Sequence, residues 1–335
     1  MIAIKRNNLP ALAKLHYERI MIKGPLPRAK LLNRCLTDLG NGYAAGSYQL
    51  NFINLLLGDV QMKHNDLETS IITCTPSNLQ KRYQFYLTNN SLAHQDEVFM
   101  KKLAKCFYYS SYDKWGAYLF AESLGVNVCP YCNRAYTFTI GSDLSKGTRP
   151  HFDHYINKAI APYFSLSFFN LIPSCYVCNS GFKKDRLLDV ADYIHPYLDD
   201  YTDEVVFTIG AKNIRFINGN SEAYSLNLVP SYLSKLSVRE LQRISATYDL
   251  FRLSELYEKH KDYVDELIQT AISFTPSRVN AVYNDFKGTL FKSREDAKKM
   301  LLGNYFMLDD LEKRPLAKLT RDISSELERL LGAKL

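Results

Sequence analysis

The sequence predicts an α+β protein in which mainly α-helical N- and C-terminal regions flank a small mixed module. Apolar residues recur at helical spacing over the first 120 or so residues and again beyond about residue 234. Between these regions lie two Cys-x-x-Cys pairs and short segments of alternating polarity. We therefore divide the 335 residues into a helical region (1–120), a central module (121–200), and a β-hairpin followed by helices (201–335).

The N-terminal helices are expected around apolar clusters such as Phe52/Leu55/Leu56, separated by breakers such as Gly24–Pro27. No chemical motif marks residues 1–120. In the last region, EVVFTIGAKNIRFI (204–217) has two alternating runs around Gly210–Asn213, which predicts a β-hairpin. C-terminal helices follow from apolar spacings of three and four, as in Leu253, Leu256, His260, Val264, Leu267 and Ala271.

The composition favours a soluble protein with an anionic partner. Forty-two Lys and Arg against 35 Asp and Glu give a net charge of +7, which suits nucleic acid, although many metabolic enzymes share it. No stretch has signal-peptide character or the apolar length of a membrane span, so we expect a cytoplasmic location and no membrane partner. Candidate backbone contacts are Arg134, Lys158, Lys183 and Lys184, for which a solvated charged surface is the alternative.

The two cysteine pairs, Cys129/Cys132 and Cys175/Cys178, predict one structural Zn²⁺ site with four thiolate ligands. The alternative is a redox pair, which would need only one Cys-x-x-Cys beside a helix of a βαβ unit. The alternating run at 133–140 predicts a strand after Cys132 instead, which favours zinc. The remaining cysteines are expected to be buried apolar residues: Cys35, Cys74 and Cys106.

Between the pairs, four polar residues suggest phosphodiester hydrolysis. That chemistry needs oxygen ligands for a cation such as Mg²⁺ and a base that deprotonates water. Asp153 and Asn179 supply oxygens, and His154 supplies a base. If Asp153 and His154 lie on one strand their side chains point to opposite faces, so a bend must bring both to the site.

This pattern resembles the HNH endonuclease family, in its zinc-stapled branch with a ββα-metal module. The resemblance rests on Asp153-His154, Asn170 and Asn179 with the flanking cysteine pairs, and covers about 60 to 70 residues. It implies an endonuclease in which His154 is the general base and Asp153 and Asn179 bind a catalytic Mg²⁺ or Mn²⁺. By the same resemblance, Asn170 fixes the loop and orients the histidine.

The longer run CPYCNR, FDHYINKAIAPYFSLSFFNLIPSCYVCNS and DYIHPY is similar to the HNH nucleases of Septu-type and retron-associated anti-phage systems. This resemblance implies a defence nuclease that works with an ABC-like ATPase encoded in the same operon. Its substrate would be nucleic acid, with DNA as the first expectation and RNA as the alternative. A zinc-stapled nucleic-acid-binding or adaptor subunit without catalysis is the competing hypothesis.

Overall fold

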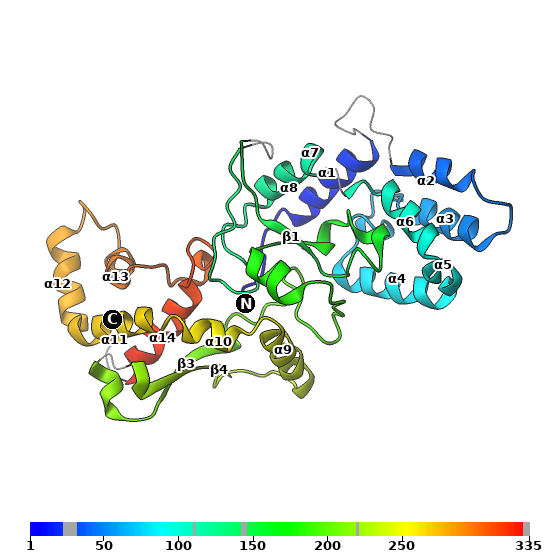
Figure 1. The fold of residues 1–335 in the computed structure, drawn as a ribbon. Helices are drawn as coiled ribbons and strands as arrows, with labels where there is room; N and C mark the ends of the chain where they lie inside the picture. The colour runs from blue at the N-terminus through cyan, green and yellow to red at the C-terminus, as the bar shows by residue number, and fades with distance from the viewer. Residues whose placement is uncertain (23–31, 110–111, 142–145, 219–220, 331–335) are drawn as a thin grey trace. The chain divides into compact units, whose positions relative to one another are not determined.

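A computed structural model describes residues 1–22, 32–109, 112–141, 146–218 and 221–330 of the chain (Figure 1). The fold is α+β and mostly helical, with two small β-hairpins. It divides into two compact units: an N-terminal unit (Ala3–Val126 and Thr137–Asp199) and a C-terminal unit (Met1–Ile2, Asn127–Tyr136 and Asp200–Leu335). Within the described ranges, no helix has the length and apolar character needed to cross a membrane.

The N-terminal unit is built on eight helices within its described residues: α1 (Leu9–Met21), α2 (Leu32–Gly40), α3 (Tyr48–Asp59), α4 (Pro76–Asn89), α5 (Ser91–Gln95), α6 (Glu97–Cys106), α7 (Tyr112–Trp115) and α8 (Ala117–Leu124). Local chemistry sets several ends. The Ser47 side chain accepts a hydrogen bond from the Leu50 amide at the start of α3, and Pro76 occupies the first turn of α4. Helix α8 ends at Gly125, whose φ of 59° suits glycine.

An aromatic core joins these helices to the segment that follows strand β1. Tyr86 of α4 stacks on Phe164, with ring centroids 6.0 Å apart, and its hydroxyl donates to Asp59 of α3 at 2.5 Å. Phe52 of α3 packs edge-on against Tyr163. The sequence run containing Tyr163 and Phe164 therefore belongs to the core.

The first hairpin of the fold pairs β1 (His151–His154) with β2 (Leu171–Ser174), in antiparallel register with His154 opposite Leu171. Short 3₁₀ helices connect the strands: η3 (Pro162–Phe164) and η4 (Phe168–Asn170). After β2 the chain enters a π-helical segment, η5 (Val177–Lys183), which contacts β1. Another 3₁₀ helix, η1 (Leu67–Thr69), precedes α4.

The C-terminal unit contains the second hairpin, in which β3 (Val205–Ala211) pairs with β4 (Tyr224–Pro230). Its helices are α9 (Val238–Leu250), α10 (Leu253–Glu258), α11 (Lys261–Ser273), α12 (Pro276–Phe286), α13 (Arg294–Leu302) and α14 (Ala317–Leu330). Its 3₁₀ turns are η6 (Ile214–Asn218), η7 (Ser221–Ala223) and η8 (Leu308–Asp310). Capping boxes start α9, at Ser237 and Glu240, and α13, at Ser293 and Asp296. Helix α14 packs against α11 and β3 within this unit (Figure 1).

The predicted hairpin at 204–217 is wrong in its second strand. Strand β3 extends through Gly210 to Ala211, and Ile214 begins a 3₁₀ turn in which its side chain is exposed. The partner strand is β4, where Tyr224 and Leu226 alternate into the core. Burial of these two side chains, rather than proximity in sequence, selects the strand that pairs with β3.

The strand predicted at 133–140 is also wrong. In its place the structure has two isolated bridges, Val128 to Tyr136 and Ile140 to Thr148. Asn133 has a φ of 49°, which reverses the chain immediately after Cys132. The resulting turn is closed by hydrogen bonds from the Asn133 amide to the Cys129 carbonyl and from the Cys129 amide to the Ala135 carbonyl.

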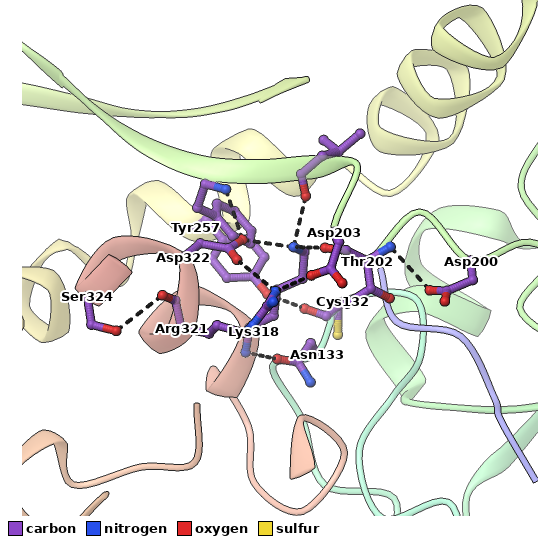
Figure 2. A network of polar contacts seen from close by, with 12 residues as sticks. Cys132, Asn133, Asp200, Thr202, Asp203, Tyr257, Lys318, Arg321, Asp322 and Ser324 are labelled. Atoms are coloured by element: carbon purple, nitrogen blue, oxygen red, sulfur yellow. Dashed lines mark hydrogen bonds and ion pairs between the residues drawn. The ribbon is translucent and has the colours of Figure 1, made fainter. Parts of the chain in front are cut away.

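Buried polar contacts fix this turn inside the C-terminal unit (Figure 2). The Asn133 side chain donates to the Leu311 carbonyl and accepts from the Lys318 amide at 3.0 Å. The Tyr257 hydroxyl donates to the Cys132 carbonyl at 2.6 Å. The Cys129–Cys132 turn is therefore anchored by residues that lie more than a hundred positions later in the chain.

Lys318 and Asp322 form a buried ion pair in the same network (Figure 2). The Lys318 ammonium lies 2.8 Å from the Asp322 carboxylate and also donates to the Thr202 and Val205 carbonyls. Asp322 in turn accepts from the Phe207 amide of β3. Because every donor and acceptor has a partner, the pair couples α14 to the hairpin without leaving an uncompensated charge.

We expect Asp322→Asn to lower the free energy of unfolding by on the order of 3–5 kcal/mol, since it leaves the buried Lys318 charge without its carboxylate. Urea unfolding followed by circular dichroism measures the loss. The matched control is Glu255→Gln, which breaks the exposed pair with Arg252 in the same unit and should leave the unfolding midpoint almost unchanged. Equal effects of the two substitutions would contradict this account of the network.

Candidate functional site: a four-cysteine cluster and a polar pocket

Four cysteines form one cluster. The sulfur atoms of Cys129, Cys132, Cys175 and Cys178 all lie within 4.8 Å of one another. The sulfurs are buried, although the Cys175 residue as a whole is partly exposed. None of the four is in a disulfide. Both Cys-x-x-Cys pairs thus contribute to the same place, as a metal site requires and a single redox pair does not.

The cluster fits a structural Zn²⁺. With Zn–S bonds of about 2.3 Å, tetrahedral thiolates lie roughly 3.8 Å apart, so the observed spacing needs only a small contraction around the ion. Each pair lies on a tight turn: the Asn133 amide bonds the Cys129 carbonyl, and the Cys178 amide points to the Cys175 sulfur at 3.4 Å. The four cysteines are therefore positioned to bind zinc. The isolated Cys35, Cys74 and Cys106 are buried, as predicted.

A separate polar pocket of about 390 Å³ lies within the N-terminal unit. It is lined by Phe152, Asp153, His154, Asn157, Lys158, Asn179, Ser180, Lys183, Lys184 and Asp185. Asp153 and His154 come from β1, and Asn179 comes from η5. His154 is the last residue of β1, and both residues of the Asp-His pair line the same pocket.

His154 is held as a neutral base. Its Nε2 lies 3.1 Å from the Ser165 carbonyl, which can only accept, so Nε2 carries the hydrogen and the Nδ1 lone pair is basic. Among the residues that the structure describes, none hydrogen-bonds to Nδ1. Burial, followed by the positive charge of Lys158, holds the pKa of His154 well below its usual range. The imidazole is therefore neutral at physiological pH and able to accept a proton.

Asp153 is paired with a lysine. The Lys183 ammonium lies 2.7 Å from Asp153 Oδ1 and also donates to the His154 carbonyl, and both side chains are at most 2% exposed. Lys183 is the last residue of η5, so this contact fastens the π-helical segment to β1. The expected metal ligand therefore faces a buried cation of the protein itself.

Asn170 fixes the loop that connects β1 to β2. Its side-chain oxygen accepts from the Ile156 amide at 2.7 Å, and its side-chain nitrogen donates to the carbonyls of Ile156 and Phe164, each at 3.0 Å. The residue is 1% exposed. Because the segment between Ile156 and Phe164 leads directly to Ser165, these three bonds also place the carbonyl that orients His154.

The predicted nucleic-acid contacts have different surroundings. Lys158 and Lys184 are exposed and line the pocket, whereas Lys183 is buried in the ion pair. Lys158 also lies over the Tyr109 ring, 4.2 Å from its centroid. Arg134 belongs to the C-terminal unit, where its Nε donates to His260 at 2.9 Å. His260, which had no motif in the sequence, thus has a defined polar partner.

Sequence reasoning missed three contacts of the Asp-His pair: the Ser165 carbonyl and the Tyr109 ring at His154, and the ion pair of Lys183 with Asp153. The Tyr109 ring meets His154 edge-on, with centroids 4.3 Å apart. A backbone carbonyl and a distant aromatic ring leave no spacing signal. The ion pair of Lys183 with Asp153 leaves none either, because thirty positions separate the two residues in the sequence.

No protein-family model, curated protein or solved structure matches the chain.

We expect the purified protein to hold about one zinc per chain, bound by the four thiolates. Cys178→Ser should release the metal and lower the thermal midpoint, because structural zinc contributes directly to folding stability. The control is Cys74→Ser, which changes a buried cysteine outside the cluster and should keep its zinc. Inductively coupled plasma mass spectrometry gives the metal content, and a wild-type protein purified without zinc would contradict the assignment.

Proposed function

We propose that the protein is a metal-dependent HNH-type endonuclease whose active site is the polar pocket formed by β1 and η5. The observation that carries the proposal is the state of His154: a buried, neutral imidazole whose basic Nδ1 has no partner among the described residues, in a pocket shared with Asp153 and Asn179. A general base must be unprotonated at the working pH and held in a fixed tautomer, and burial together with the Ser165 contact supports both conditions for His154.

In this proposal His154 takes the proton of the attacking water at Nδ1. The Nε2–H group keeps donating to the Ser165 carbonyl, which holds the ring orientation fixed while the charge develops. Asn170 acts through the loop rather than on the substrate, since its three hydrogen bonds are all to backbone atoms. It is therefore a positioning residue.

Asp153 and Asn179 are the residues that would hold a catalytic Mg²⁺ or Mn²⁺. Their carboxylate and amide oxygens are of the kind that hard cations prefer, and both residues line the pocket. When bound, the cation would stabilise the negative charge that develops on the phosphate and the leaving oxygen. The zinc cluster has a structural role in this account, since its four sulfurs leave no open ligand position.

The proposed substrate is a nucleic acid, with DNA preferred over RNA on the resemblance alone. The exposed ammonium groups of Lys158 and Lys184 at the pocket are suited to a phosphate backbone. The same resemblance suggests an anti-phage role with an ABC-like ATPase as partner, which would control an otherwise harmful nuclease. Stable co-purification with the product of the neighbouring ATPase gene would support this partnership.

A zinc-stapled nucleic-acid-binding or adaptor subunit without catalysis is the second candidate. The observation that favours it is the Lys183–Asp153 ion pair, which occupies the carboxylate that a catalytic cation would use. In an adaptor the pocket would be a structural remnant, and substitutions at Asp153 or Asn179 would leave the biological activity intact.

We expect His154→Ala to lower the cleavage rate by about 10² to 10⁴, the usual contribution of a general base. The assay follows cleavage of labelled duplex DNA, single-stranded DNA and RNA with Mg²⁺ or Mn²⁺, in the presence of the ATPase partner. The matched control is His151→Ala, which removes an exposed histidine from the same strand and should retain most of the wild-type rate.

A His154→Ala protein that cleaves as fast as the wild type would exclude His154 as the base. Circular dichroism and zinc content of both variants show whether any loss of activity reflects loss of the fold.

A further inference from the structure

The charge balance at Asp153 bears on how the proposed catalytic cation is bound. Asp153 and Lys183 are almost completely buried, and their charged atoms lie 2.7 Å apart. Water cannot reach this buried carboxylate to stabilise its negative charge. The ammonium group compensates that charge instead, as a bound metal ion would.

Lys183 is held in that position by more than the ion pair. Its ammonium also donates to the His154 carbonyl, at the end of β1. It lies at the end of η5, the segment that carries Asn179. Asn179 thus lies on the same element as Lys183, and Asp153 is paired with Lys183 directly. A cation that approaches Asp153 therefore meets the positive charge of the Lys183 ammonium.

We infer that Lys183 is a built-in competitor of the divalent cation for Asp153, so that it keeps the affinity of the pocket for metal low. This inference rests on the proposed function and concerns the regulation of that same site. The free protein then binds catalytic metal weakly, and a negatively charged phosphate in the pocket favours metal binding by drawing the ammonium away from Asp153. Such a pocket would restrain a nuclease while its substrate is absent.

Binding of Mn²⁺ to the zinc-loaded protein without nucleic acid tests the competition, with free Mn²⁺ measured by electron paramagnetic resonance. Lys183→Met removes the charge and should tighten Mn²⁺ binding at least about tenfold, because an approaching cation no longer meets the ammonium group that lies 2.7 Å from Asp153. For the same reason Mn²⁺ should raise the thermal midpoint of this variant more than that of the wild type. Lys183→Gln, which keeps a hydrogen-bond donor, replaces it if the methionine variant does not fold.

The matched control is Lys184→Met, which removes a charge from the next residue, an exposed lysine of the same pocket. It should change Mn²⁺ affinity far less, because an exposed charge is screened by water and salt. Asp153→Asn should remove the weak Mn²⁺ binding of the wild type and, combined with Lys183→Met, should abolish the tight site of that variant, which identifies the ligand.

The outcomes separate the two proposals. If the wild type binds Mn²⁺ through Asp153 and Lys183→Met binds it no more tightly, or if Lys184→Met has the same effect, the competition is refuted while the nuclease assignment stands. If neither the wild type nor Lys183→Met binds Mn²⁺ in a way that depends on Asp153, the metal site itself is refuted, together with the inference built on it.

Discussion

The geometry of the proposed active site depends on the hydrogen bonds of one buried side chain, Asn170. A hairpin of four residue pairs is too short to hold its own connecting loop. The Asn170 side-chain amide holds this loop in place through hydrogen bonds to the backbone of Ile156 and Phe164. Further bonds from Ser167 to Ile71 and from the Phe168 amide to Ile72 fasten the same loop to the segment before α4. The position of the Ser165 carbonyl, and with it the tautomer of His154, follows from this frame.

Electrostatic interactions give His154 and Asp153, which are neighbours on β1, different roles. His154 is buried and lies near the positive charges of Lys158 and Lys183, which lower its pKa, so the imidazole stays neutral. Asp153, one position earlier, is compensated by Lys183. The same lysine therefore contributes to two conditions that a hydrolytic site needs: a base that is not already protonated, and a carboxylate that is held in place. We infer that the Lys183 ammonium also makes it harder for a metal ion to bind Asp153.

Much of this could be predicted from the sequence. The α+β class and the four-cysteine cluster leave local signals, namely helical periodicity and Cys-x-x-Cys spacing. The strand and helical positions of Asp153, His154 and Asn179 were expected from the family resemblance. The two incorrect strand predictions, at 133–140 and in the second half of 204–217, have a common physical cause. The partner of β3 and the course of the chain after Cys132 are decided by residues far away in the sequence, such as Tyr224 and Lys318, whose backbone amide donates to the Asn133 side chain. The ion pair of Lys183 was missed because a lysine after a metal motif is usually solvated, and only burial reveals its partner.

The central claim is that β1 and η5 present a metal-dependent hydrolytic pocket. The most direct measurement is anomalous diffraction at the manganese edge, from crystals of the protein grown with Mn²⁺ and a short DNA strand. We predict a manganese peak in contact with the Asp153 carboxylate and close to Asn179, with the Lys183 ammonium displaced towards a phosphate. A pocket without manganese at saturating concentration, with the Lys183–Asp153 pair still intact beside bound DNA, would contradict the account.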